Sequence, residues 1–282
     1  MDQDSVGRLC PVIALNMSGI LEEEEDIPLT EPLIDCRDIA GTDCYCDDIA
    51  KQMISDRLED HGTEGVHFLD SGNYHYLSLL FMNEIPREQD FELVLFDNHP
   101  DSQEPAFGEI TSCGGWVREA WETMPNLKQV TMIGVDPELL LDEGYSDGVN
   151  VIDRGEGWDP IRVTVAVGES HKSYRQLLNG TYGEGNREDS LESKLPVYIS
   201  VDKDVLRVED AQCNWSQGEM RKDELLELLK ELKESREVLG IDVCGEEDAQ
   251  AMTEATKLNE RTNCEIAELM AGTTSDRVHT IL

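Results

Sequence analysis

The sequence predicts an α/β layer fold in which largely parallel strands alternate with helices. Short apolar runs alternate along the chain with longer segments of helical periodicity. Several of the apolar runs are rich in valine and isoleucine, which is typical of strands buried on both faces. Strands interleaved with helices indicate parallel pairing. No linker rich in proline, glycine or serine divides the chain, so we expect residues 1–282 to form one domain.

Eight apolar runs are the candidate strands. In chain order they are Val12–Leu15, Val66–Leu69, Glu92–Phe96, Val130–Val135, Val149–Ile152, Arg162–Val167, Val197–Val201 and Val238–Ile241. Four segments between and after them have helical patterns: Ile49–Leu58, Tyr76–Met82, Lys222–Arg236 and Glu247–Met270. The third carries a leucine stripe at helical spacing, which indicates core packing. The acidic stretch 20–32 and the polar stretch 179–194 have the composition of surface loops.

The charge balance excludes two classes of partner. The chain has 61 Asp and Glu against 23 Lys and Arg, for a formal net charge of −38. Such a chain repels nucleic acid and anionic membranes, so neither is an expected partner. A bound cation or a salt-rich environment suits the charge better. The N-terminus opens with acidic residues and has only a short apolar run, which fits neither a signal peptide nor a membrane span.

The eight cysteines are scattered and form no CxxC pair. This pattern predicts reduced thiols in a cytoplasm rather than a disulfide framework. Cys44 and Cys46 together with Cys36 are an alternative metal site. No matching His/Cys pair follows at the spacing of a zinc site, which weighs against that alternative.

The stretch "ELVLFDNHPDSQ" suggests a metal site at the end of a strand. Asp97, His99 and Asp101 follow an apolar run at every second position, so in an extended chain their side chains point to one side. The carboxyl ends of strands are where α/β sheets usually place ligands. Two carboxylates and an imidazole suit Mn, Fe or Zn.

Two further segments add to this group. In "LPVYISVDKDVL" a second strand ends in Asp202 and Asp204, with Lys203 expected on the opposite side. In "VHFLDSGNYHYLSLLF" a strand and a glycine turn precede His75 and an apolar helix. Four ionised carboxylates in one pocket would repel each other, and two divalent cations would neutralise them. The alternative is a set of solvated acids at strand ends.

These motifs resemble those of the ureohydrolase (arginase/agmatinase) family. The marks of that family are a glycine-rich turn with a histidine, then D-x-H-x-D, then S-x-D-x-D. Here they read "SGNYHY", "DNHPD" and "SVDKDVL", in the same order, and the resemblance spans about 65–246. It implies a three-layer sandwich with a largely parallel central sheet flanked by helices, a fold shared in outline with histone deacetylases. It also implies trimers or hexamers as an open alternative to a monomer.

The resemblance implies a role for each ligand. Asp97 and Asp202 would bridge two divalent cations, most often Mn. His75 and Asp101 would complete one site, and His99 and Asp204 the other. A hydroxide that bridges the two ions would attack an amidine carbon.

Three positions depart from the family pattern. Tyr74 precedes His75 where the first motif of the family commonly has an aspartate. "TSCGGWVREAW" places Cys113 where agmatinase-like members carry a proton-shuttling histidine, and a thiol near a metal can also relay a proton. The alternative for Cys113 is a small buried hydrophobe. "LGIDVCGEE" places Gly245 where the family has a glutamate that pairs with guanidinium, with Glu246 one position later. Glu246 is the second candidate proton donor.

The leading hypothesis is a binuclear metal-dependent hydrolase. It would cleave a C–N bond in a small linear guanidine, amidine or amide. Its cavity is expected between Gln103, Cys113, Trp116, Trp215 and Glu246. Two alternatives remain open: a deacylase-like amidohydrolase and a catalytically degenerate relative that binds metal.

Overall fold

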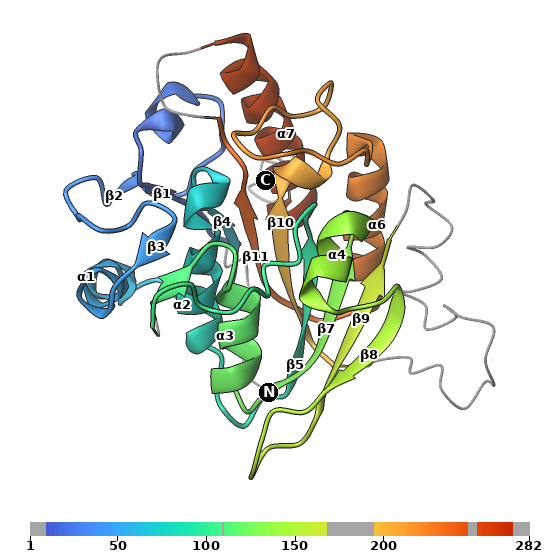
Figure 1. Cartoon of the computed structure of the whole chain (residues 1–282). Coiled ribbons are helices and arrows are strands. Elements are labelled where there is room, and N and C mark those ends of the chain that lie inside the picture. Colours follow the sequence, from blue (N-terminus) through green and yellow to red (C-terminus); the bar gives the residue numbers. More distant parts are fainter. Residues whose placement is uncertain (1–9, 109, 168–194, 248–252, 273–282) are drawn as a thin grey trace, which may run out of the picture.

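The computed structural model describes residues 10–108, 110–167, 195–247 and 253–272. Within them a nine-stranded sheet runs in the order β2-β1-β4-β11-β10-β5-β7-β9-β8 (Figure 1). Its strands are β1 (Val12–Asn16), β2 (Ile34–Asp35), β4 (Val66–Phe68), β5 (Phe91–Phe96), β7 (Leu127–Ile133), β8 (Gly148–Ile152), β9 (Ile161–Ala166), β10 (Val197–Asp202) and β11 (Val238–Cys244). All eight expected strands are present, with ends shifted by up to three residues.

Parallel pairing holds throughout this sheet except at one edge. Strands β8 and β9 are antiparallel, with Val149 opposite Thr164. A short connection joins these two strands without a helix, and antiparallel neighbours need no crossover. The expectation of parallel pairing therefore fails only at this hairpin.

Helices cover both faces of the sheet, so the expected three-layer sandwich is confirmed (Figure 1). Helices α1 (Asp48–Leu58), α2 (Ser78–Asn83) and α3 (Trp116–Thr123) pack on one face. Helices α6 (Lys222–Ser235) and α7 (Glu254–Ala271) pack on the other. The leucine stripe of α6 is buried as predicted. Helix α4 (Pro137–Glu143) contributes Leu140 to the core on the first face.

Several elements differ from the expectation. Helices α3 and α4 were not predicted, and neither was the two-stranded sheet of β3 (Tyr45–Cys46) and β6 (Thr111–Ser112). The expected helix 247–270 begins at Glu254 instead, where Thr253 caps it, and residues 248–252 lie outside the described ranges. The expected loop 179–194 also lies outside them. No helix among the described residues is long and apolar enough to cross a membrane.

The acidic stretch 20–32 is only partly a surface loop. It contains the 3-10 helix η1 (Ile20–Glu23), and Ile20, Leu21 and Ile27 are buried in the core with α6 and α7. Glu24 is also buried, at 4% exposure. Composition alone predicts a solvated loop here, whereas the chain turns three apolar side chains and one acid inward.

Candidate metal centre

Neighbouring strands bring the six predicted ligands together at the carboxyl ends of the parallel strands. His75 lies in the 3-10 helix η2 (Gly72–Leu77), which follows β4. Asp97 follows β5, Asp202 ends β10, and Asp204 lies in the 3-10 helix η3 (Lys203–Val205). Because β4, β11, β10 and β5 are adjacent and parallel, their carboxyl ends meet at the same edge.

The segment after β5 reaches this edge by a turn and not by an extended chain. Asp101 has φ of 47°, in the left-handed region, and the strand ends at Phe96. The prediction that Asp97, His99 and Asp101 lie close together is met, but its stated reason, an extended backbone, is wrong. The indole Nε1 of Trp116 donates a hydrogen bond to Asp101 Oδ2 at 2.7 Å and so fixes the end of the turn.

One group of ligand atoms lies around His75. Its Nδ1 is 2.9 Å from Asp101 Oδ2, 3.2 Å from Asp97 Oδ2 and 3.7 Å from Asp202 Oδ2. Its other ring nitrogen, Nε2, is 2.8 Å from Ser200 Oγ, which sets the orientation of the ring. The serine lies two residues before Asp202, on the same face of β10.

A second group lies around His99. Its Nδ1 is 2.8 Å from Asp204 Oδ2 and 3.4 Å from Asp97 Oδ1. Its Nε2 is 3.0 Å from Ser216 Oγ. Asp97 thus directs Oδ2 toward His75 and Oδ1 toward His99. One carboxylate therefore directs one oxygen toward each of two imidazoles.

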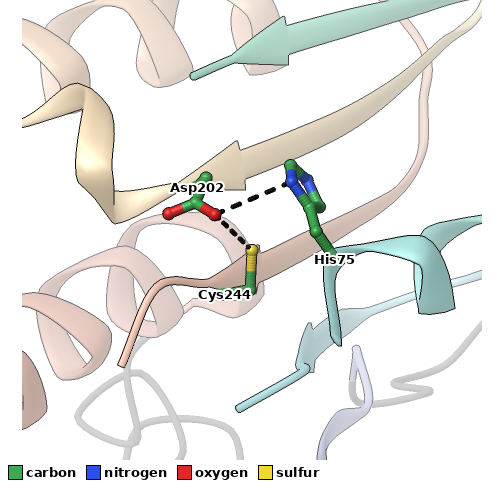
Figure 2. Close-up of side chains that lie close together, drawn as sticks. All are labelled: His75, Asp202 and Cys244. Atoms are coloured by element: carbon green, nitrogen blue, oxygen red, sulfur yellow. Dashed lines mark hydrogen bonds and ion pairs between the residues drawn. The ribbon is translucent and has the colours of Figure 1, made fainter. Parts of the chain in front are cut away.

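Cys244 is a neighbour that the sequence motifs do not include. Figure 2 shows its thiol pointing at the same carboxylate oxygen of Asp202 that faces His75. Cys244 Sγ is 3.2 Å from Asp202 Oδ2, and the residue is buried at the end of β11. Its position could have been suspected from the sequence, because Cys244 stands at the carboxyl end of an apolar strand, as Asp202 does.

The pKa values of the group reflect burial and the close packing of its charges. Burial alone lowers the pKa of His99, but hydrogen bonds to Asp204 and Asp97 outweigh it and raise that pKa to about 12. Burial also lowers the pKa of His75, but the nearby carboxylates of Asp101 and Asp97 outweigh it and raise that pKa. Burial, followed by repulsion from Asp97, raises the pKa of Asp204 to about 6. Both imidazoles therefore carry protons at neutral pH.

Two buried atoms indicate what the group is built to hold. His75 Nδ1 and Asp97 Oδ2 are buried without a hydrogen-bond partner, although they lie 3.2 Å apart. Buried polar atoms are rarely left unpaired. Carboxylate oxygens and imidazole nitrogens are donors that Mn, Fe and Zn accept. The residues present therefore fit divalent cations.

A cavity of about 250 Å³ opens onto these residues. Five of the six predicted ligands line it, and His75 lies behind them. The wall also includes Cys113, Gln103 and Trp215, as expected. Trp116 and Glu246 are not among the lining residues. Burial, with the nearby charge of Asp101, raises the pKa of the Cys113 thiol.

Glu246 lies in a separate buried network. Its carboxylate pairs with the ammonium of Lys203, which is on the opposite side of the chain from Asp202, as predicted. Asn263 of α7 donates to Glu246 Oε1 at 2.8 Å and to Glu24 Oε2 at 2.7 Å. Lys203 Nζ donates to Asn263 Oδ1 at 2.9 Å. The position of Glu246 therefore gives no support to a direct role in catalysis.

Gly245 stands at the position where the family resemblance implies a glutamate that pairs with guanidinium. Its φ is 92°, a conformation that favours glycine. A Cβ atom at this position would lie only 2.4 Å from Asp202 Oδ1. The same atom would lie 2.7 Å from the backbone nitrogen of Lys203, so a glutamate cannot be accommodated here unless both Asp202 and that backbone move.

The family model described as "Arginase family" matches residues 14–247. No curated protein matches the chain by sequence. Solved structures do match by fold. Proclavaminate amidino hydrolase from Streptomyces clavuligerus superposes with a TM-score of 0.61 and 17% identity, covering 94% of this chain and 92% of its own.

Two other solved structures match almost as well. Arginase from Bacillus cereus has a TM-score of 0.57 and 13% identity, with coverage of 93% of this chain and 96% of its own. Formimidoylglutamase from Bacillus subtilis subsp. subtilis str. 168 has a TM-score of 0.55 and 15% identity, with coverage of 92% and 85%. At these identities the similarity supports the fold alone.

Proposed function

This chain belongs to the arginase family, and on that premise we propose that it is a hydrolase of C–N bonds that works with two divalent cations, with Mn²⁺ as the favoured metal. The observation that carries the proposal is Asp97, whose two oxygens face two imidazoles, His75 and His99. Asp202 and Asp101 complete the group at His75, and Asp204 completes the group at His99.

Bound cations would supply two effects, polarising the bond to be cleaved and lowering the pKa of a water molecule. The chain supplies the positioning. Ser200 and Ser216 hold the two imidazole rings, and Trp116 holds Asp101. With each ring fixed through its second nitrogen, the nitrogen that faces the carboxylates is the one available to a cation.

Cys113 is proposed as the proton donor to the leaving nitrogen. Hydrolysis adds water to carbon, breaks the C–N bond and leaves a nitrogen that must gain a proton. Because burial raises the pKa of the Cys113 thiol, the group holds its proton at neutral pH and suits the role of an acid better than that of a base. It lies in the cavity wall with Gln103 and Ser112, whose polar groups can orient a substrate.

The proposed substrate is a small linear guanidine, amidine or amide. The described lining residues include no lysine or arginine, which disfavours a strongly anionic substrate. Gly245 and the turned-away Glu246 leave the described wall without the glutamate clamp for guanidinium. This favours an amidine or amide. Two fold relatives have names that specify an amidino hydrolase and a formimidoylglutamase. The missing clamp also favours one alternative, a relative that binds metal without hydrolysis.

A substrate panel with added Mn²⁺ separates these functions. Guanidines, amidines and amides would be incubated with the protein, with urea or ammonia release as the readout. We expect release that is lost in Asp204→Asn and retained in Asp56→Asn, a matched change at an exposed aspartate of α1. Metal binding without release from any compound would support the degenerate relative. Equal release by both variants would overturn the proposal.

A further inference from the structure

Two cysteines lie next to each other at the end of the small sheet beside the metal centre. Strands β3 and β6 are antiparallel, with Tyr45 opposite Ser112 and Cys46 opposite Thr111. Cys44 comes just before β3 and has a φ of 58°, so it turns away from the extended conformation of the strand. The backbone N–H of Cys113 donates to the carbonyl of Cys44 at 2.9 Å, which brings the two backbones into contact. The two residues are far apart in the chain and become neighbours only through this sheet.

The two thiols also interact, since each shifts the pKa of the other. With nitrogen and oxygen 2.9 Å apart in the backbone hydrogen bond, the two Cα atoms are at most about 7 Å apart. That limit reaches into the range of about 4.4–6.8 Å that disulfides span. Both residues are half-buried and line the cavity of the metal centre.

We propose that Cys44 and Cys113 are a site of reversible oxidation, where a disulfide forms in the wall of the cavity. The oxidant is a hydroperoxide such as hydrogen peroxide. One thiolate attacks a peroxide oxygen, which breaks the O–O bond and gives a sulfenic acid and water after protonation. The second thiol displaces the sulfenic hydroxyl as water and forms the S–S bond. In sum, two thiols and one peroxide give one disulfide and two waters.

The disulfide would change the cavity wall in two ways. It removes the thiol proton of Cys113. In the proposed function, on which this effect rests, that proton is given to the leaving nitrogen. The disulfide also removes the Cys44 thiol hydrogen, whose sulfur is 3.8 Å from Asp43 Oδ1. That oxygen accepts a hydrogen bond from Asn73 Nδ2, and Asn73 Oδ1 accepts one from Trp215 Nε1, each at 2.8 Å. Oxidation therefore acts on a chain of contacts that leads from Cys44 to Trp215, another residue of the cavity wall.

The surroundings of the thiols fix the conditions of the test. Burial, followed by the nearby charge of an aspartate, raises the pKa of each thiol: Asp43 for Cys44 and Asp101 for Cys113. Since the thiolate is the reactive form, oxidation is slow at neutral pH and faster under mildly alkaline conditions. Once one sulfur is oxidised, the other cysteine is its neighbour in the same cavity wall, so we expect the second step to outrun further oxidation.

The experiment is a peptide map of the full, Mn-loaded chain. Reduced protein would be treated with hydrogen peroxide, its free thiols alkylated, and the digest analysed without reductant. We expect a cross-linked pair of peptides that contains Cys44 and Cys113, with the other six cysteines alkylated. Dithiothreitol should restore both thiols. Oxidation at other cysteines while this pair stays free, or sulfinic acid on one of the two, would overturn the proposal.

Two variants sharpen the map. Cys264→Ser removes a half-buried thiol of α7 outside the pair and should leave the cross-link intact. Cys44→Ser should abolish it and leave Cys113 to form a sulfenic acid that dimedone traps. A cross-link from Cys113 to another cysteine in wild-type protein would contradict the assignment. The wild-type map needs no activity, so it can fail while the proposed hydrolysis stands, and it can succeed where hydrolysis fails.

Discussion

Replacing Lys203 with methionine tests the buried network that holds Glu246. Lys203 is completely buried, Glu246 is 2% exposed, and the two are paired. Burial raises the pKa of Glu246, but the charge of Lys203 outweighs it, so that pKa is lowered and the carboxylate is ionised. Methionine fills a similar volume without the charge. Lys203→Met therefore leaves a buried carboxylate with Asn263 but without its counter-ion.

The expected loss in the free energy of unfolding follows from the burial of Glu246. Removing one partner of a buried ion pair typically costs about 3–5 kcal/mol. For a chain of this size that corresponds to a fall in melting temperature of roughly 10 °C. The free energy of unfolding would be measured by urea denaturation of the Mn-loaded protein. The loss should shrink as the pH falls, because protonation neutralises the stranded Glu246.

The matched controls decide whether the charge is the cause. Lys230→Met removes a surface partner of Glu234, at 3.8 Å, and should change stability by less than about 0.5 kcal/mol. The double variant Lys203→Met/Glu246→Gln should recover most of the loss. A loss below about 1 kcal/mol in Lys203→Met, or a double variant no more stable than the single one, would refute the reasoning.

Three further predictions concern protons. Burial, followed by the charge of Glu246, raises the pKa of Glu24 to about 10, so this contribution to stability is full below the unfolded pKa and declines as pH rises toward 10. Glu24→Gln should remove a slope of about 1.4 kcal/mol per pH unit from urea unfolding between about pH 6 and 9, and equal slopes would contradict this. Because their pKa values are raised, His75 and His99 are both protonated, so cation binding should release protons and become tighter as the pH rises. Calorimetry in buffers of different ionisation enthalpy would detect the released protons. Binding heats that do not depend on the buffer would count against this prediction. Cys113→Ala should lower turnover without changing metal content, and Cys113→His should be tolerated; unchanged turnover with lower stability would reduce Cys113 to packing.

The pattern of apolar residues predicts most of the strands and helices, because long apolar strands have a strong local signal. The elements that were missed have short or mixed signals. Strands β2, β3 and β6 have two residues each, too few to show alternation. Helix α4 did have local signals, with Asp136 as its cap, Pro137 at its start and Gly144 at its end. Helix α3 lies in the stretch that contains Cys113, and that stretch was interpreted for the role of its thiol and not for its secondary structure.

The candidate site divides in the same way between local and long-range information. The six ligand types follow from three short motifs, each readable in sequence. The destination of Glu246 does not, because Lys203, Glu24 and Asn263 come from three distant segments. The contact of Cys44 with Cys113 likewise depends on the pairing of β3 with β6. Short motifs predict which side chains belong to the site, but not which remote partner the neighbouring residues meet.

Metal stoichiometry tests the central claim most directly. Metal-free protein would be dialysed to equilibrium against Mn²⁺ and its bound metal measured by mass spectrometry. The account predicts about two ions per chain in the wild type and in Asp56→Asn, and close to none in Asp97→Ala/Asp202→Ala. Wild-type protein that binds no Mn²⁺, or a double variant that binds as much as the wild type, would contradict it.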